Sequence, residues 1–131
     1  MKQTRLLIVD DVPEVRQELG LLLPLAGPIE VVGEAANGAE ALSQAESLQP
    51  EVVLLDLEMP EMDGFAACRL LKQRSLAARV VVLSIHAGPE EMSAATAAGA
   101  DAFVAKGASL EALLDAILRP AQGKENPWLR Q

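Results

Sequence analysis

Five side chains that could do chemistry stand at the carboxyl ends of apolar runs in this 131-residue sequence. Asp10 and Asp11 end "RLLIVDD", and Asp56 ends "VVLLD". Ser84 closes "VVVLS", and Lys106 closes "AFVAK". An ionised carboxylate is costly to bury alone, so each buried aspartate must meet a cation or hydrogen-bond donors. The five side chains are therefore candidates for one shared polar site.

The residue types predict the chemistry of that site. Carboxylates held close together repel one another, and burial strengthens the repulsion. Mg²⁺ would neutralise them, because it binds one or two carboxylates, a carbonyl, waters and a phosphate oxygen. An aspartate can also act as a nucleophile and form an aspartyl phosphate. A hydroxyl and an ammonium could then hold the remaining phosphoryl oxygens. We therefore expect a site for one phosphoryl group.

Each residue also has an ordinary structural explanation. Asp11 could cap the following helix, with Glu14 completing a capping box. Asp10 could be a solvated strand end, and Ser84 could satisfy a local backbone group. Lys106 could be a surface lysine. Five such coincidences at one end of one sheet explain the pattern less well than a shared site does.

The runs that carry these residues have the length and composition of β-strands. Three are apolar almost throughout, which predicts strands buried on both faces of a parallel sheet, whereas the second and fifth are weaker and predict edge strands. In chain order, the five runs occupy residues 5–9, 30–35, 52–56, 80–85 and 102–106.

Helical patterns separate the runs. The spacing of Val12, Val15, Leu19 and Leu22 predicts a first helix. Ser109 is the expected N-cap of the last and most clearly amphipathic helix. The segment 89–98 has little bulk to bury, so we expect a helix that is easily displaced. The five helices are predicted near residues 12–22, 38–48, 64–74, 89–98 and 110–118.

Alternating strands and helices predict an α/β fold of the (βα)5 type, a doubly wound five-stranded parallel sheet with helices on both faces. In the flavodoxin-like strand order 2-1-3-4-5, the first and third strands are neighbours. Asp10, Asp11 and Asp56 then converge where such folds bind ligands. Ser84 and Lys106 would flank them from the fourth and fifth strands.

Composition limits the function classes. Hydrophobic residues make up 50% of the chain and aromatic residues 2%, so the core must be aliphatic. The net charge of −8 argues against this chain itself gripping nucleic acid or an anionic membrane. The single cysteine, Cys68, fits a reducing compartment. No apolar run is long enough to span a bilayer, so we expect a cytoplasmic protein.

Four motifs in order carry a family resemblance: "VDD", "LLDLEMPEMDG", "VLS" and "AGADAFVAK". From Arg5 to about Leu118 the sequence resembles the receiver domain of two-component response regulators. We accordingly expect a receiver domain at residues 1–118. Residues 119–131, rich in proline and polar residues, are expected to form a tail or linker.

The resemblance implies a role for each site residue. Asp56 would be the phosphoacceptor. Asp10, Asp11, Asp56 and the backbone carbonyl of Glu58 would bind Mg²⁺.

On the other side of the phosphoacceptor, Ser84 and Lys106 would contact the phosphoryl group. Phe103 would be the aromatic switch residue that turns inward when Ser84 moves. Pro60 and Gly64 would shape the loop after the third strand.

The stretches "LSIHAG" and "AGADAFVAKGAS" are similar to the NarL/LuxR-type subfamily, which usually carries a DNA-binding helix-turn-helix domain after the receiver. The implied partners are a sensor histidine kinase and, on activation, a second copy in a homodimer. The implied role is regulatory rather than enzymatic. A stand-alone regulator acting through protein contacts and a phosphorylation-independent pseudo-receiver remain open alternatives.

Some features depart from the family or point elsewhere. Gly107 stands where many receivers have a proline, so no cis peptide bond is assumed there. The resemblance implies that the positions of Glu58 and His86, which vary in the family, influence phosphoryl lifetime, and no metal-binding role is assigned to His86. The turn "DDVPE" would repel phosphate without a metal, which disfavours a flavodoxin-like cofactor binder. Glu58 replaces the second aspartate expected of a haloacid dehalogenase-like phosphatase.

Overall fold

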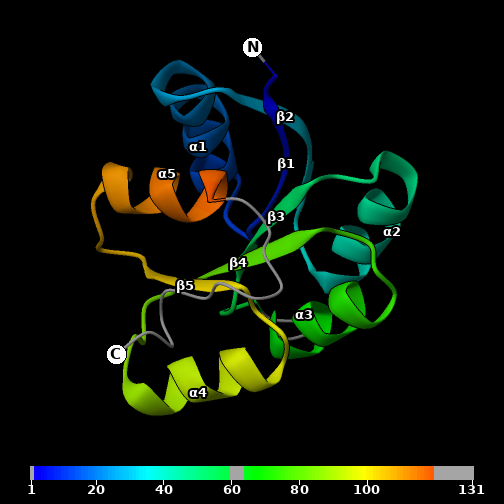
Figure 1. Cartoon of the computed structure of the whole chain (residues 1–131), viewed down its shortest axis with the longest axis vertical. Coiled ribbons are helices and arrows are strands. Elements are labelled where there is room, and N and C mark those ends of the chain that lie inside the picture. Colours follow the sequence, from blue (N-terminus) through cyan, green and yellow to red (C-terminus); the bar gives the residue numbers. More distant parts are fainter. Residues whose placement is uncertain (1, 60–63, 120–131) are drawn as a thin grey trace.

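The computed structural model describes residues 2–59 and 64–119 (Figure 1). Its centre is one five-stranded sheet in the order β2-β1-β3-β4-β5, and all neighbouring strands run parallel. This confirms the predicted fold class and strand order. The strands are β1 (Thr4–Val9), β2 (Ile29–Ala35), β3 (Val52–Asp56), β4 (Arg79–Ser84) and β5 (Ala102–Ala105).

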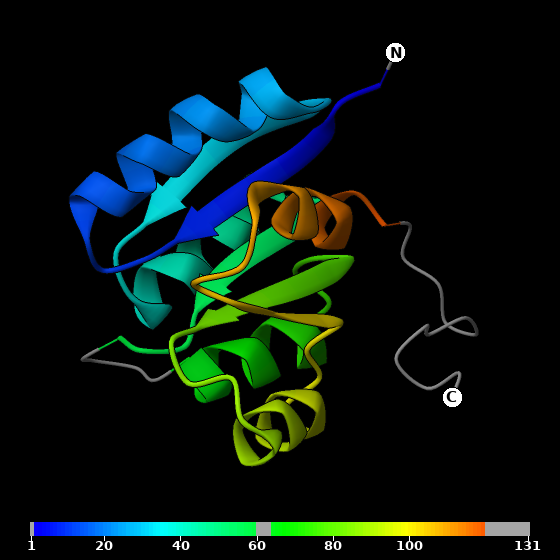
Figure 2. The ribbon, with the colours of Figure 1, turned by 90° about the vertical axis from the view of Figure 1, so that its left-hand side faces the viewer.

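Helices cover both faces of the sheet. One face carries α1 and α5, and the opposite face carries α2, α3 and α4 (Figures 1 and 2). Such two-sided cover is what right-handed connections between parallel strands require. The helices are α1 (Pro13–Ala26), α2 (Gly38–Leu48), α3 (Gly64–Gln73), α4 (Pro89–Ala97) and α5 (Leu110–Leu118).

The central strand β3 shows why its sequence is apolar throughout. Leu54 packs into the core beneath α1 and α5, whereas Val53 and Leu55 pack into the core on the other face. All five residues of β3 are buried, as are all six of β4. Burying each such aliphatic side chain contributes roughly 1.5–3 kcal/mol. The edge positions of β2 and β5 confirm the reading of the two weaker runs.

The predicted cap of the first helix is wrong. The N-cap of α1 is Val12, which has no side-chain cap, and Pro13 follows it. Instead, the Val12 amide donates to Asp10 Oδ1 at 2.9 Å. Asp10 therefore turns the chain there through one oxygen, and both Asp10 and Asp11 belong to the acidic cluster described below. At α5, by contrast, Ser109 Oγ accepts from the Ala112 amide at 3.1 Å, which confirms that cap.

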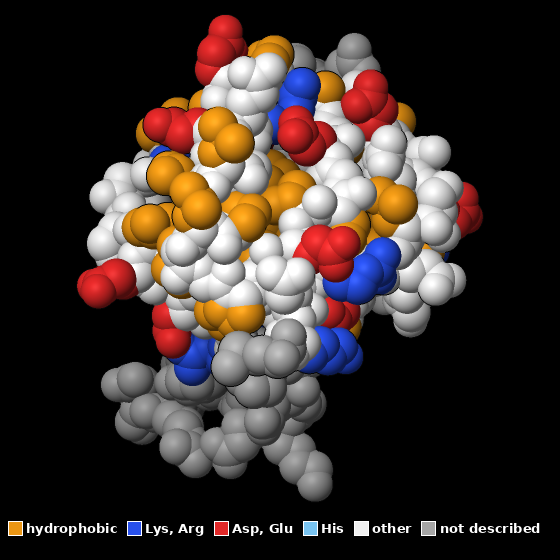
Figure 3. Space-filling model, turned by 90° about the horizontal axis from the view of Figure 1, so that it is seen from above, with side chains coloured by type: hydrophobic (Ala, Val, Ile, Leu, Met, Phe, Trp, Pro, Cys, Tyr) orange, Lys and Arg blue, Asp and Glu red, His pale blue; other side chains and the backbone are white. Residues whose placement is uncertain are grey.

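The apolar stripe of α1 lies differently from the prediction. Leu23 is the buried residue of this helix, while Val12 and Leu22 are exposed. Leu21 and Leu25 are exposed as well. Figure 3 looks onto the face where α1 ends and shows apolar side chains gathered there among scattered charges. Leu19, on the predicted stripe, is partly buried against the core beneath α1 and α5. Val15 and Leu19 also line a groove between α1 and α5.

Helix α4 is as weakly anchored as its composition suggested. Ala95 is its one buried residue, whereas the equally long α5 buries Leu113, Ala116 and Ile117. Its ready displacement stays a prediction. Within the described residues, no helix is long and apolar enough to cross a bilayer. Pro60 and the predicted tail beyond Arg119 lie outside the described residues.

Candidate functional site

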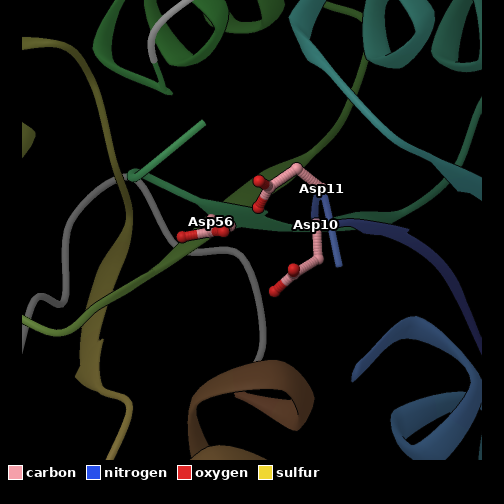
Figure 4. Close-up of side chains that lie close together, drawn as sticks. All are labelled: Asp10, Asp11 and Asp56. Carbon is pink, nitrogen blue, oxygen red and sulfur yellow. The ribbon is translucent and has the colours of Figure 1, made fainter. Parts of the chain in front are cut away.

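Three carboxylates meet at the carboxyl end of the sheet. Asp10 and Asp11 directly follow β1, and Asp56 is the last residue of β3. Parallel pairing sets Val9 beside Leu55, so the acids that follow are brought to the same edge. One carboxylate oxygen from each of the three lies within 4.8 Å of the others (Figure 4). Asp10 and Asp56 are only 2% and 1% exposed.

The acidic cluster has unused ligand atoms. Among the described residues, the buried atoms Asp10 Oδ2 and Asp56 Oδ2 have no hydrogen-bond partner. Buried carboxylate oxygens without partners are expensive, and several like charges together add to the cost. Hard oxygen donors at this separation fit Mg²⁺, which prefers carboxylate ligands. These residues therefore satisfy the requirements for a divalent cation site.

The other oxygen of Asp56 is fully engaged. Lys106 Nζ lies 2.9 Å from Asp56 Oδ1, and the Glu58 amide donates to the same oxygen at 3.0 Å. Lys106 follows β5 and reaches across the end of β4 to β3. One Asp56 oxygen is thus held by donors, while the other faces no described partner.

Burial dominates the titration of Asp56. It raises the pKa of this carboxyl to about 6, although the hydrogen bonds from Lys106 and the Glu58 amide oppose the shift. The charge of Asp10 adds to the increase. For Lys106, burial lowers the pKa, but the hydrogen bond with Asp56 and the surrounding acids outweigh burial and raise it. A bound divalent cation would favour the ionised form of Asp56.

The Glu58 side chain joins the site in a way that the sequence reading missed. Ser84 Oγ donates to Glu58 Oε2 at 2.5 Å, and the Ile85 amide donates to Glu58 Oε1 at 3.1 Å. Lys106 Nζ lies 3.6 Å from the same Oε1. Burial alone would raise the pKa of Glu58, but these donors together lower it. Its predicted metal role concerned only the backbone carbonyl.

The remaining predicted residues surround this centre. Phe103 is partly buried and packs against the core under α2, α3 and α4. A Cβ atom on Gly64 would come within 2.5 Å of Leu57 Cα, so the chain needs glycine at the start of α3. His86 is exposed, and its amide donates to Ser84 Oγ at 3.1 Å. The described residues contain no cis peptide bond, and the bond between Lys106 and Gly107 is therefore trans.

Comparison with known proteins gives a consistent match. A family model for the response regulator receiver domain matches residues 6–118. The nitrate/nitrite response regulator protein NarL of Escherichia coli is 40% identical over 119 residues, which cover 91% of this chain and 55% of that protein. The chain therefore spans about half the length of the curated relatives it matches.

Solved structures agree with the sequence match. The signal receiver domain of NarL from Mycobacterium tuberculosis superposes with a TM-score of 0.85 at 33% identity, covering 95% of this chain and 100% of that one. A DNA-binding response regulator of the LuxR family from Staphylococcus aureus gives 0.80 at 31% identity, covering 87% and 95%.

Proposed function

The chain belongs to the response regulator receiver family, and from that membership we propose that Asp56 accepts a phosphoryl group from the phosphohistidine of a sensor histidine kinase. The observation that carries this proposal is the asymmetry of Asp56. Its Oδ1 is held by Lys106 and the Glu58 amide, whereas its buried Oδ2 has no partner among residues 2–59 and 64–119 and lies beside the acids that follow β1.

The transfer needs little covalent chemistry from the protein. The bond between phosphorus and the histidine nitrogen breaks, and its electron pair stays on that nitrogen. A carboxylate oxygen of Asp56 forms the new bond to phosphorus, which gives an aspartyl phosphate. Lys106 supplies positive charge beside the acceptor, and Ser84 supplies a hydroxyl for a phosphoryl oxygen. The protein's contribution is positioning and charge neutralisation.

Asp10, Asp11 and Asp56, together with the backbone carbonyl of Glu58, are the residues proposed to hold Mg²⁺. When bound, this cation would neutralise the acids and the incoming phosphoryl oxygens. This assignment is supported by the buried atoms Asp10 Oδ2 and Asp56 Oδ2, which have no hydrogen-bond partner within the part of the chain that the structure describes.

Phosphorylation would act as a local electrostatic change with a wider structural response. We infer that Ser84 moves toward the phosphoryl group and that Phe103 turns into the space it leaves. The face formed by α4, β5 and α5 would change with them, and the light burial of α4 supports this. This face would carry the contacts of an activated homodimer.

The output is proposed to be transcriptional. The LuxR-family relative is a DNA-binding response regulator, and this chain spans 55% of the NarL protein of E. coli. We propose that residues 119–131 lead toward a DNA-binding domain in the full-length protein. The receiver family is regulatory, and a cytoplasmic location would give the domain access to kinase and DNA.

Beryllofluoride with Mg²⁺, which mimics phosphoaspartate, tests the proposal. Amide NMR spectra of the wild-type chain should shift at Ser84, at Phe103 and along α4. The Asp56→Asn variant should show no such shifts. Unchanged wild-type spectra at saturating beryllofluoride would refute the proposed function.

A further inference from the structure

We propose that, before phosphorylation, the Glu58 carboxylate accepts hydrogen bonds from the donors that would bind the phosphoryl group. The Glu58 carboxylate is therefore a competitor for these donors, and the phosphoryl group must displace it. This inference deepens the proposed function and rests on it. It concerns the side chain of Glu58, whose backbone carbonyl has the separate role proposed above.

The first step is the identity of the donors around Glu58. They are a hydroxyl from Ser84, a backbone amide from Ile85 and the ammonium of Lys106, at 2.5, 3.1 and 3.6 Å. A hydroxyl, an amide and an ammonium are the groups that also bind phosphoryl oxygens. Because the same ammonium lies 2.9 Å from Asp56 Oδ1, the Glu58 carboxylate sits directly beside the proposed phosphoacceptor.

The second step is how firmly Glu58 is held. Its amide donates to Asp56 Oδ1, so the loop after β3 folds back onto the acceptor. Its side chain then bridges to the end of β4 through Ser84 and Ile85. The Ser84 hydroxyl has one proton, which goes to the charged carboxylate rather than to the His86 carbonyl 3.0 Å away. Glu58 therefore fixes the rotamer of the proposed switch hydroxyl.

The third step is charge. A phosphoryl group on Asp56 would add a charge of about −2 to the space beside the Glu58 carboxylate. Like charges that share one set of donors disfavour each other, so Glu58 must leave when the phosphoryl group arrives. A hydrogen bond to a charged group corresponds to roughly 10- to 100-fold in an equilibrium constant. The competitor should weaken phosphoryl binding by about that factor.

The displacement also has a route to α4. The His86 amide donates to Ser84 Oγ, so the backbone after β4 is tied to the hydroxyl that Glu58 holds. Pro89, the first residue of α4, follows a short loop. Release of Glu58 would therefore free both Ser84 and the chain that leads into this lightly buried helix.

Titration of beryllofluoride at fixed Mg²⁺ tests the proposal, with amide NMR as the readout. Glu58→Ala should tighten beryllofluoride binding by about 10- to 100-fold, and Glu58→Gln should give a smaller gain because an amide still accepts hydrogen bonds. Glu18→Gln is the matched control. Glu18 lines the groove that Asp10 and Lys106 also line, so its substitution removes one nearby charge without changing a contact of Ser84. Its effect should stay below about twofold, since exposed charges are screened.

A second measurement needs no phosphoryl mimic. In the unphosphorylated chain, the Ile85 amide proton should move upfield in Glu58→Ala as its bond to the carboxylate is lost. If Glu58→Ala binds beryllofluoride with wild-type affinity while Asp56→Asn still abolishes the spectral response, Glu58 is not a competitor. The proposed function would remain supported in that case. An unmoved Ile85 amide would overturn the competitor too. No response even in wild type would instead refute the proposed function, and the competitor with it.

Discussion

Lys106 Nζ lies 2.9 Å from Asp56 Oδ1, and this ion pair joins the end of β5 to the end of β3 across the intervening strand β4. Asp56 is almost fully buried, whereas the Lys106 side chain is 29% exposed. The two partners are therefore unequal. The Asp56 carboxylate needs the Lys106 ammonium to stabilise its charge, because the carboxylate has almost no contact with water. The ammonium, by contrast, can still be solvated.

Removing the ammonium should raise the pKa of Asp56. We expect Lys106→Ala to move this pKa above about 6, because the hydrogen bond and the charge of Lys106 both lower it in the wild-type chain. Lys106→Arg, which keeps the positive charge, should restore most of the difference. Carbon-13 NMR of the Asp56 carboxyl group across a pH series measures the effect. An unchanged titration in Lys106→Ala would show that the ion pair does not form in solution.

The buried charge of Asp56 should make the metal-free chain less stable above pH 6 than below about pH 4. The pKa is raised from 3.8 to about 6 on folding. The folded state therefore binds more protons than the unfolded state between these values, and the free energy of unfolding falls as pH rises through that window. The shift corresponds to on the order of 3 kcal/mol.

Asp56→Asn should therefore stabilise the metal-free chain at pH 8 and flatten the pH dependence. Urea unfolding at a series of pH values tests this, with Glu46→Gln as a control at an exposed position on α2. Equal stability of wild type and Asp56→Asn at pH 8 would contradict the account of burial.

Magnesium should relieve the same repulsion. At a concentration about 100 times its dissociation constant, Mg²⁺ should stabilise the folded chain by roughly 2.7 kcal/mol. Asp10→Asn and Asp11→Asn should each lose most of this increment, because each removes a carboxylate from the cluster. Thermal unfolding with Mg²⁺ and with EDTA measures it. An increment that survives both substitutions would place the cation elsewhere.

Substitution by alanine should change the stability of the chain at one of two glycines beside the site and not at the other. A Cβ atom on Gly64 would meet Leu57 Cα at 2.5 Å and the Asp56 carbonyl oxygen at 2.8 Å, and neither backbone atom can move cheaply. Gly64→Ala should cost roughly 1–3 kcal/mol of stability. A Cβ atom on Gly107 has nothing within 4 Å, so Gly107→Ala should be neutral within about 0.5 kcal/mol. Urea unfolding of the pair checks this, and equal costs would refute the steric argument.

The sheet could be predicted because its central strands are buried on both faces. That environment demands unbroken apolar runs, and such runs end visibly at Asp56 and Ser84. The strand order then accounts for the meeting of the acids. The sequence could not decide which of two adjacent aspartates turns the chain into α1. Asp10 does so, through the Val12 amide, and the predicted cap at Asp11 was wrong.

The Glu58 network was beyond the sequence for a different reason. Its partners Ser84 and Ile85 come from another strand, and they meet Glu58 only because β3 pairs with β4 in one register, with Asp56 beside Leu83. The periodicity of the sequence predicts on which face of a strand or helix a side chain lies. It does not predict which hydrogen-bond partner a long, flexible glutamate side chain has. The available signals were an acidic residue two positions after Asp56 and the resemblance, which links that position to phosphoryl lifetime.

The most direct test of the central claim is intact-mass spectrometry after incubation with acetyl phosphate and Mg²⁺. The account predicts a mass increase of one phosphoryl group on the wild-type chain, located on Asp56 by peptide analysis and lost at alkaline pH as an acyl phosphate should be. Asp56→Asn should gain no mass. A phosphoryl group found on another residue, or a wild-type chain that never gains one, would contradict the account.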